Sequence, residues 1–497
     1  MAKKTINKEL TGAQDLYNFL FEACNIIRGP VSQDNFKDYI TPLLYYKRIS
    51  DVYDEETEEA LISSGGDKEY ASLPEQHRFV IPDGCHWQEV RERTENLGAA
   101  IVGAMRQIEI ANPDTLYGVL SMFSSQKWTN KAILNDSKIR DLIEHLSKRK
   151  LGNKDYPADL MGDAYEILLK KFADDSKAQA GEFYTPRSVV RLLVHILDPQ
   201  PGETVYDPAC GSGGMLIEAI RYMHDDSLCC GSIFGQEKNV VNAAIAKMNL
   251  FLHGASDFNV MQGDTLRDPK ILQGGNIAKF DCVIANPPFS LENWGATEWS
   301  SDKYKRNIYG TPSDSCGDYA WIQHMICSMS SGKGRMAVVM PQGILFRGNQ
   351  EAEIRKQLVE SDLIEAVVTL GDKLFYGTGL SPCFLIIRRM KQAHHSGRIL
   401  MIDGSKILTQ KRAQNILEEN DIDRLYSLYQ NYSDEEDYSR IVTLQEIRDK
   451  EYNLSPNRYV VYHKEEIRPY AEVLAEFKQA YADVKRLESE FSLLINA

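Results

Sequence analysis

The chain of 497 residues is long enough for two or three domains and at least one full-sized hydrophobic core. Hydrophobic residues make up 43% and charged residues 26%, which is ordinary for a globular protein, and no apolar run approaches the roughly 20 residues that span a bilayer. The net charge of −14 argues against a protein that holds nucleic acid by bulk charge, because phosphate binding needs positive charge. Residues 1–5 have no apolar stretch behind them, so we expect no secretory signal, no membrane contact and a cytoplasmic protein.

The first third of the chain has the apolar spacing of helices. Leu16, Phe19 and Leu20 recur at the intervals of one helix face, and the stretch 138–146 repeats the pattern. We therefore predict an N-terminal helical domain over residues 1–150.

From about residue 157 short apolar strands alternate with helices, which is typical of a parallel α/β sheet. The predicted catalytic domain covers residues 151–408. The expected strands are 204–206, 232–235, 258–261, 280–285, 335–340, 363–370, 383–387 and 399–402. The expected helices between them include 214–223, 240–252, 319–329 and 351–360.

The end of the chain divides into two parts. Residues 409–462 are polar and mixed, so we interpret them as a connecting region. In residues 463–497 apolar side chains step by three and four positions, the a/d spacing of a heptad repeat, which predicts one long helix. Such a seam packs either on its own domain or on a partner helix, and the strict spacing of about 3.5 residues favours a partner. The seam consists of Tyr470, Val473, Phe477, Ala480, Val484, Leu487, Phe491 and Leu494.

A glycine-rich turn follows the first predicted strand. The strand runs to Asp207, and Gly211-Ser212-Gly213-Gly214 then leads into a helix. Glycines permit a tight turn and let a ligand approach the backbone, while the start of the helix offers free N–H groups. Dinucleotide-binding folds use a similar turn, but G-x-G-x-x-G is absent here. A nearly neutral loop of this kind suits a cationic sulfonium better than a pyrophosphate.

The next two strands are also followed by carboxylates. Glu237 follows the second strand, where a carboxylate is placed to accept hydrogen bonds from both ribose hydroxyls of a nucleoside cofactor. Asp264 follows the third strand and is placed to accept from the adenine amino group of that cofactor. Taken alone, Glu237 would more often be a surface or capping acid, and a Gly-Asp pair also makes a simple turn. The position of Glu237, one βα unit after the glycine-rich turn, favours the cofactor.

The fourth strand ends in Asn286-Pro287-Pro288-Phe289, the most specific feature of the sequence. This turn brings a polar side chain and an aromatic ring to the carboxyl edge of the sheet, where α/β folds bind ligands. An exocyclic amine on adenine is a poor nucleophile because its lone pair is delocalised into the ring. Hydrogen bonds to the Asn286 side-chain oxygen and the Pro287 carbonyl would favour a tetrahedral nitrogen that attacks a sulfonium methyl directly. Phe289 would stack on the base once it has left the duplex.

The segment Gly181-Glu182-Phe183-Tyr184-Thr185-Pro186 lies just ahead of the predicted helix 186–197. Thr185 and Pro186 have the form of an N-cap and a first-turn proline. We expect Glu182 and Tyr184 to sit next to the cofactor site.

Several other chemistries lack their motifs. The nine cysteines include no C-x-x-C pair, and no ligand-spaced histidine cluster is found, so we expect no metal site. The one Pro-Cys pair, Pro382-Cys383, enters an apolar strand and is better interpreted as core than as the nucleophile of a cytosine C5 methyltransferase. No G-x-x-x-x-G-K-[ST] motif of an ATP motor is present.

In combination these motifs resemble the γ-ordered amino-methyltransferases, and nearly the whole chain resembles the modification subunits of type I restriction-modification systems. Further stretches that carry the resemblance are 26–30, 318–324, 340–346 and 452–459. The resemblance implies an α/β fold with a Rossmann-like, S-adenosylmethionine-dependent methyltransferase core, an N-terminal helical domain and a C-terminal heptad helix. It also implies adenine-N6 methylation of double-stranded DNA, with residues 182–186, 212–214 and Glu237 contacting the cofactor.

The resemblance further implies a complex of two such chains with one DNA-specificity subunit, joined by a restriction (nuclease/translocase) subunit for cleavage. The sequence also points to partners. The polar stretch and the heptad helix leave little room for a separate target-recognition domain. The acidic net charge fits a catalytic subunit that relies on another chain to grip DNA.

Other functions remain open at this point. A solitary DNA amino-methyltransferase would need the same motifs. A protein-glutamine methyltransferase also uses an Asn-Pro-Pro-aromatic turn, because a glutamine amide presents a similar planar nitrogen, although the helical N-terminal region and the heptad tail argue against it. A non-enzymatic scaffold is disfavoured by the intact set of site residues, and an N4-cytosine target by Asn rather than Ser at the start of the turn.

Overall fold

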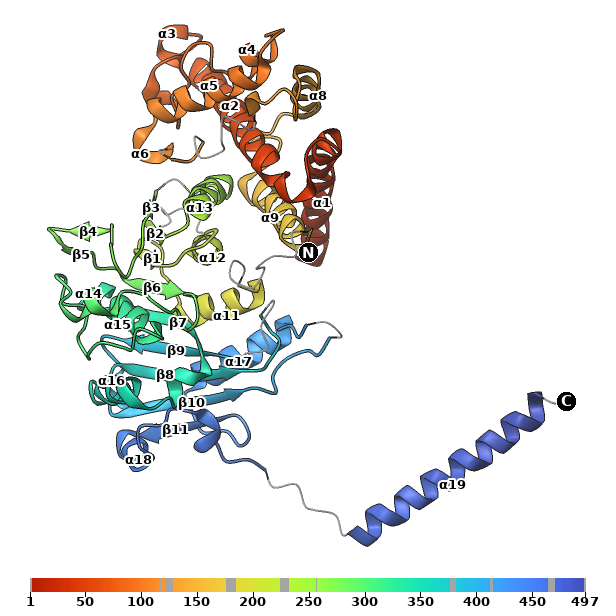
Figure 1. Ribbon diagram of the computed structural model, residues 1–497, viewed down its shortest axis with the longest axis vertical. Helices are drawn as coiled ribbons and strands as arrows, with labels where there is room; N and C mark the ends of the chain where they lie inside the picture. The colour runs from red at the N-terminus through yellow and green to blue at the C-terminus, as the bar shows by residue number, and fades with distance from the viewer. Residues whose placement is uncertain are drawn as a thin grey trace.

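The computed structural model describes residues 2–116, 118–120, 128–175, 185–223, 232–255, 257–375, 381–411, 414–463 and 470–495. Figure 1 shows three parts along the chain, namely a group of N-terminal helices, a central sheet flanked by helices, and a single C-terminal helix. Among the described helices, none is both long and apolar enough to cross a bilayer.

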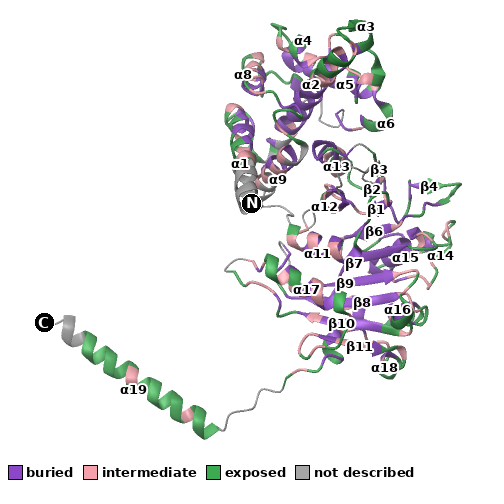
Figure 2. Cartoon of the chain, turned by 180° about the vertical axis from the view of Figure 1, so that it is seen from behind, coloured by how far each residue is buried: buried purple, intermediate pink, exposed green. Residues whose placement is uncertain are grey.

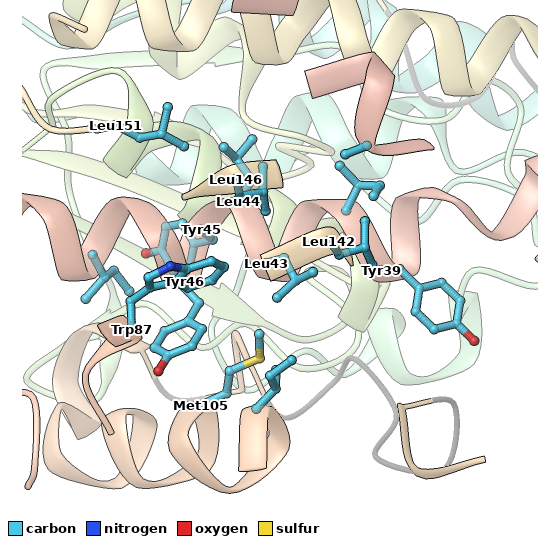
Figure 3. Packing of buried hydrophobic residues seen from close by; sticks show 14 of the residues in the cluster. Tyr39, Leu43, Leu44, Tyr45, Tyr46, Trp87, Met105, Leu142, Leu146 and Leu151 are labelled. Atoms are coloured by element: carbon cyan, nitrogen blue, oxygen red, sulfur yellow. The ribbon is translucent and has the colours of Figure 1, made fainter. Parts of the chain in front are cut away.

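The N-terminal helices pack around one hydrophobic core. Figure 3 shows Tyr46, Trp87, Met105 and Leu142 meeting in it, and each comes from a different helix. The helical spacing predicted for this part is therefore confirmed. The helices are α1 (Ala2–Ile27), α2 (Lys37–Ser63), α3 (Lys68–Ala71), α4 (Trp87–Arg91), α5 (Leu97–Ala111), α6 (Pro113–Leu116), α8 (Asp136–Leu146) and α9 (Ala158–Asp175), with 3-10 turns η1 (Gln33–Asn35) and η2 (Pro74–Gln76).

The central sheet has nine strands in the order β11-β10-β8-β9-β7-β6-β1-β2-β3. All neighbouring strands run parallel except at β9 and β11, which are antiparallel to their neighbours. A separate two-stranded hairpin, β4–β5, follows β3. The strands are β1 (Val205–Asp207), β2 (Ile233–Glu237), β3 (Phe258–Gln262), β4 (Leu272–Gln273), β5 (Asn276–Ile277), β6 (Cys282–Ala285), β7 (Arg335–Pro341), β8 (Ile364–Leu370), β9 (Pro382–Arg388), β10 (Arg398–Gly404) and β11 (Ser439–Thr443).

Helices cover both faces of this sheet, as expected for an α/β fold with largely parallel strands. Central strands such as β7 and β8 are buried along their whole length (Figure 2). One face packs against α11 (Arg187–Leu197), α12 (Gly214–Met223), α13 (Val240–Leu252) and α17 (Glu419–Asn431). The other face packs against α14 (Ala296–Ser300), α15 (Asp318–Ser328), α16 (Asn349–Glu360) and α18 (Leu444–Asp449), and shorter turns are η3 (Gln342–Leu345), η4 (Ala393–His395) and η5 (Pro456–Arg458).

Two expectations need correction. The sequence predicted a parallel sheet, and most neighbouring strands are parallel, but β9 runs antiparallel to both β8 and β7. Residues 409–462 were interpreted as a connecting region, but they contain α17, β11 and α18. β11 extends the sheet beside β10, and α17 buries Ile422 and Leu425 against it. β11 lies at the edge of the sheet, and α17 is buried on one side only. The polar residues on their outer faces therefore dominate the composition of residues 409–462.

The C-terminal helix α19 (Tyr470–Ile495) matches the predicted heptad helix. It lies apart from the rest of the chain in Figure 1 and is green along almost its whole described length in Figure 2. Of the seam side chains, Tyr470 is 79% exposed, Phe477 66% and Phe491 65%. Within the described residues the seam therefore does not pack on its own domain.

Candidate active site

The parallel strands β1, β2, β3 and β6 end at the same edge of the sheet, and the predicted site residues follow these ends. β6 is buried along its length in the middle of the sheet, between β1 and β7. The turn that follows it is thus fixed by the most buried part of the fold.

Asn286 is the first residue after β6 and has a fixed amide orientation. Its Nδ2 donates a hydrogen bond of 2.8 Å to the Thr185 hydroxyl oxygen. Its Oδ1 is buried and has no hydrogen-bond partner among the described residues. A buried acceptor without a partner costs about 1–3 kcal/mol, so its presence calls for an explanation beyond stability. An incoming N–H donor would satisfy it.

The hydrogen bond from Asn286 shows that the role predicted for the Thr185 side chain is wrong. We predicted that Thr185 caps the following helix, but α11 begins at Arg187, its N-cap is Pro186, and no side chain caps it. The Thr185 hydroxyl instead accepts from Asn286. The preceding candidates Gly181, Glu182, Phe183 and Tyr184 lie outside the described residues.

An aromatic pair lies at the end of the turn. The ring of Phe289 is half-buried, and its centroid is 6.2 Å from that of Phe375 at an interplanar angle of 53°. Phe375 belongs to the loop after β8 and was not predicted as a site residue. The only signal for it in the sequence is an aromatic residue after a predicted strand, because no local pattern indicates that this loop reaches the turn after β6.

The far end of the turn is held by a buried carboxylate. Ser290 adopts a left-handed backbone with φ of 50°, and its N–H donates to Asp318 Oδ1 at 2.7 Å. Asp318, at the start of α15, has no exposed surface, and its Oδ2 accepts from Arg347 at 2.9 Å. This network fixes where Phe289 can point.

Three side chains close to this network could together offer atoms to a metal ion. The candidate ligand atoms of Cys316, Asp318 and Glu351 lie within 4.8 Å of one another. Arg347 donates to all three, at 2.9, 2.9 and 3.1 Å. Burial raises the pKa of the Cys316 thiol to about 12, and the positive charge among these groups is the Arg347 guanidinium. The cluster is accordingly an ion-pair network centred on a guanidinium.

The glycine-rich turn lies beyond β1. Gly211 and Gly213 have φ of 52° and 84°, a backbone region that favours glycine. Apart from its chain neighbours, no described residue places a heavy atom within 4 Å of the position that a Cβ would take at Gly211 or Gly214, which leaves room for a ligand beside the backbone. Burial and, to a smaller extent, the neighbouring Glu237 carboxylate raise the pKa of Asp207 to about 8. Asp207 is therefore mostly protonated at neutral pH.

Glu237 lies directly against this turn. Its Oε2 accepts from the Gly211 N–H at 3.0 Å, and its Oε1 accepts from the Asn239 N–H at 2.7 Å. Each carboxylate oxygen has a second lone pair, so both retain capacity for a ligand hydroxyl. Asp264 faces the same end of β2, because its Oδ2 lies 2.9 Å from Lys238 Nζ. The structure thus brings together the predicted residues after the first, second and third strands.

Two family models together match most of the chain. The family model of the N-6 DNA methylases matches residues 156–467, and that of the HsdM N-terminal domain matches residues 16–146. The chain belongs to the N-6 DNA methylase family. The methylase subunit of the type I restriction enzyme MjaVII of Methanocaldococcus jannaschii is 35% identical over 471 residues, which cover 90% of this methylase and 78% of that protein.

More distant relatives are also methyltransferase subunits of type I restriction-modification systems. The EcoKI methylase subunit of Escherichia coli is 27% identical over 394 residues, 76% of this methylase and 67% of that protein. The crystal structure of a type I restriction-modification methyltransferase subunit from Streptococcus thermophilus has a TM-score of 0.77 at 26% identity, and the match covers 91% of this methylase and 100% of that chain. The expectation of a type I modification subunit with a methyltransferase core is confirmed.

Proposed function

We propose that this methylase activates the N6 amine of a flipped adenine at the Asn286 turn. The observation that carries the proposal is the Asn286 amide, whose Nδ2 is engaged by Thr185 while its buried Oδ1 is left without a partner. An amine N–H pointing at this oxygen would give it a partner and draw the nitrogen towards tetrahedral geometry. The Pro287 carbonyl is the second acceptor in this proposal, and positioning is the main contribution to the rate.

Phe289 and Phe375 are proposed to flank the base. Their ring centroids are 6.2 Å apart at an interplanar angle of 53°, so a planar base would stack between them only after the rings turn towards parallel and separate. A base held there is removed from the duplex, as methyl transfer to a ring amine requires. The Asp318–Arg347 network keeps the Phe289 side of this slot in place.

S-adenosylmethionine would supply the methyl group on a cationic sulfur. The residues present fit it, because the uncovered backbone at Gly211 and Gly214 leaves room for a ligand and Glu237 retains acceptor capacity for ribose hydroxyls. We assign the ribose to Glu237, the adenine amino group to Asp264, and further contacts with the cofactor to residues 181–186. Asp207 directly precedes the turn, and the positive charge of a sulfonium bound nearby would favour its ionised form.

In this proposal the methylase acts on double-stranded DNA. It assembles with a DNA-specificity subunit, a second copy of itself and a restriction subunit. The exposed seam of α19 supports a helical partner, since a helix of 26 residues with an uncovered apolar face is poorly stabilised in water by itself. A specificity subunit with apolar helices would cover it.

The decisive experiment uses the chain co-purified with its specificity subunit. Asn286→Ala should abolish methyl transfer to duplex DNA, while calorimetric binding of S-adenosylhomocysteine stays within about twofold of the unmodified chain. Mapping of the methylated bases should place the methyl group on adenine N6. Retained activity of the Asn286→Ala complex, or modification of a protein glutamine instead of DNA, would refute the proposal.

A further inference from the structure

Helix α13 touches two parts of the molecule that are far apart in the chain. Its Ala246 and Leu250 belong to the hydrophobic core beneath the sheet, whereas its Met248, Phe251 and Leu252 belong to the core of the N-terminal helices. The ring of Phe251 lies 5.1 Å from Tyr45 and 4.9 Å from Phe79, both edge-on. One helix is thus shared between the N-terminal part and the methyltransferase core.

The same helix supports the glycine-rich turn. A Cβ at Gly213 would lie 3.5 Å from backbone atoms of Ala246, so the turn lies directly on α13. Asn249, one helical turn further on, is buried, and its Nδ2 donates a hydrogen bond of 3.0 Å to the Ser212 carbonyl. The start of α13 touches the same site, because the Asn239 N–H donates to Glu237.

The buried Asn249 side chain contributes less to the stability of the core than an apolar side chain would. Its Oδ1 is buried and has no hydrogen-bond partner among the described residues. An amide whose buried oxygen has no partner stabilises a helix–sheet interface less than an apolar side chain of the same size would. Packing alone therefore does not account for an asparagine at this position, whereas the bond to Ser212 does.

We propose that Asn249 is a positioning residue that holds the glycine-rich turn in its ligand-binding shape, and that packing of the N-terminal helices on α13 sets the affinity for the nucleoside cofactor through it. The inference rests on the proposed function, because it takes the turn at 211–214 as the cofactor site. Asn249 holds the Ser212 carbonyl against the helix and so fixes the backbone of a turn whose Gly211 N–H donates to Glu237. Phe251, two positions further along the same helix, anchors α13 to the N-terminal core.

The test measures binding of S-adenosylhomocysteine to the full chain by calorimetry, so that no catalytic step enters. Asn249→Leu has a similar volume but cannot donate, and Asn249→Asp keeps the shape and polarity but presents oxygen to the Ser212 carbonyl. Both should raise the Kd by roughly 3- to 10-fold, the effect of one lost hydrogen bond. Hydrogen exchange of residues 210–214 in the free protein should become faster in both variants.

Leu250→Val is the matched control on the same helix. Leu250 is buried in the core beneath the sheet, so this change lowers the unfolding temperature without touching the turn, and the Kd should stay unchanged. A Kd of Asn249→Leu and Asn249→Asp equal to that of the unmodified chain would overturn the proposal. If the unmodified chain itself fails to bind S-adenosylhomocysteine, the proposed function fails instead.

A double-mutant cycle tests the link to the N-terminal helices. Phe251→Ala removes the contacts to Tyr45 and Phe79 and should weaken binding of S-adenosylhomocysteine in the unmodified background by about threefold. In the Asn249→Leu background it should have no further effect, because the route through Asn249 is already broken. Equal effects of Phe251→Ala in both backgrounds would refute the coupling through Asn249.

Discussion

The Asn286 amide and the Thr185 hydroxyl are joined by a hydrogen bond of 2.8 Å across 101 positions of the chain. The bond links the turn after the central strand β6 to the segment just ahead of α11. The amide nitrogen is engaged in this bond, and the buried amide oxygen has no partner among the described residues. Thr185 therefore positions the group that we propose as the acceptor in methyl transfer.

Thr185→Val should slow methyl transfer by roughly 5- to 10-fold. Valine has nearly the shape of threonine but offers no oxygen, so the Asn286 amide loses about 1 kcal/mol of orienting interaction and can rotate its nitrogen towards the substrate. Single-turnover rates of the complex with its specificity subunit measure this step separately from product release. Thr185→Ser retains the hydroxyl and should stay close to the unmodified rate, and an equally slow serine variant would contradict the assignment.

Asp207 should make the stability of the chain depend on pH. Its pKa is about 8 in the folded protein, mainly through burial, against 3.8 for an unperturbed Asp. Between these values the folded state keeps the proton that the unfolded chain has released, so the free energy of unfolding falls as pH rises. One pKa unit corresponds to about 1.4 kcal/mol, and the loss from this group between pH 6 and pH 8 is on the order of 2 kcal/mol.

Asp207→Asn removes this titration. Denaturant unfolding at pH 6, 7 and 8 should show a smaller decline with pH for the variant than for the unmodified chain, with the two curves farthest apart at pH 8. Parallel curves would show that Asp207 is ionised in the folded protein throughout this range.

Replacing Phe375 should slow methyl transfer to the base without changing the affinity for the cofactor. Stacking of a base on an aromatic ring is worth about 1–3 kcal/mol, so Phe375→Ala should reduce methyl transfer by roughly 10- to 100-fold. A duplex with 2-aminopurine at the target position reports the same contact, because loss of stacking raises its fluorescence in the complex. Phe375→Tyr keeps the ring and should preserve most of the activity, while binding of S-adenosylhomocysteine should be unchanged in both variants.

The regular part of the fold was predictable from local patterns. Buried strands with short apolar runs, such as β6 and β7, and helices that follow glycine or capping residues, such as α12 and α13, match their expected ranges within a few residues. The residues of the turns after β1, β2 and β6 were predictable for the same reason, since parallel strands bring their carboxyl ends to one edge.

Contacts between distant loops could not be predicted in this way. The partner of Asn286 is fixed by how α11 lies against the sheet, and the partner of Phe289 by the loop that joins β8 to an antiparallel β9. Neither leaves a periodic signal in the sequence. β11 escaped detection because it is an edge strand with only partial burial, so it lacks the continuous apolar run of a central strand.

Lys373 is expected to contact a DNA phosphate near the flipped base. It is exposed, lies two positions before Phe375, has φ of 55°, and forms no ion pair with any described residue. Its backbone carbonyl accepts from the Asn415 N–H at 3.0 Å, which fixes the loop. A lysine held at the rim of the base slot in this way is placed to neutralise one phosphate, although the chain as a whole is acidic.

Lys373→Gln should weaken DNA binding by the complex with its specificity subunit and make that binding less sensitive to salt. Loss of one phosphate contact reduces the slope of log affinity against log salt concentration by about 0.9. Arg398→Gln is the matched control, because Arg398 is an exposed cation at the start of β10, on the opposite edge of the same sheet. Fluorescence anisotropy between about 50 and 200 mM salt distinguishes the two, and equal slopes for both variants and the unmodified complex would rule out the contact.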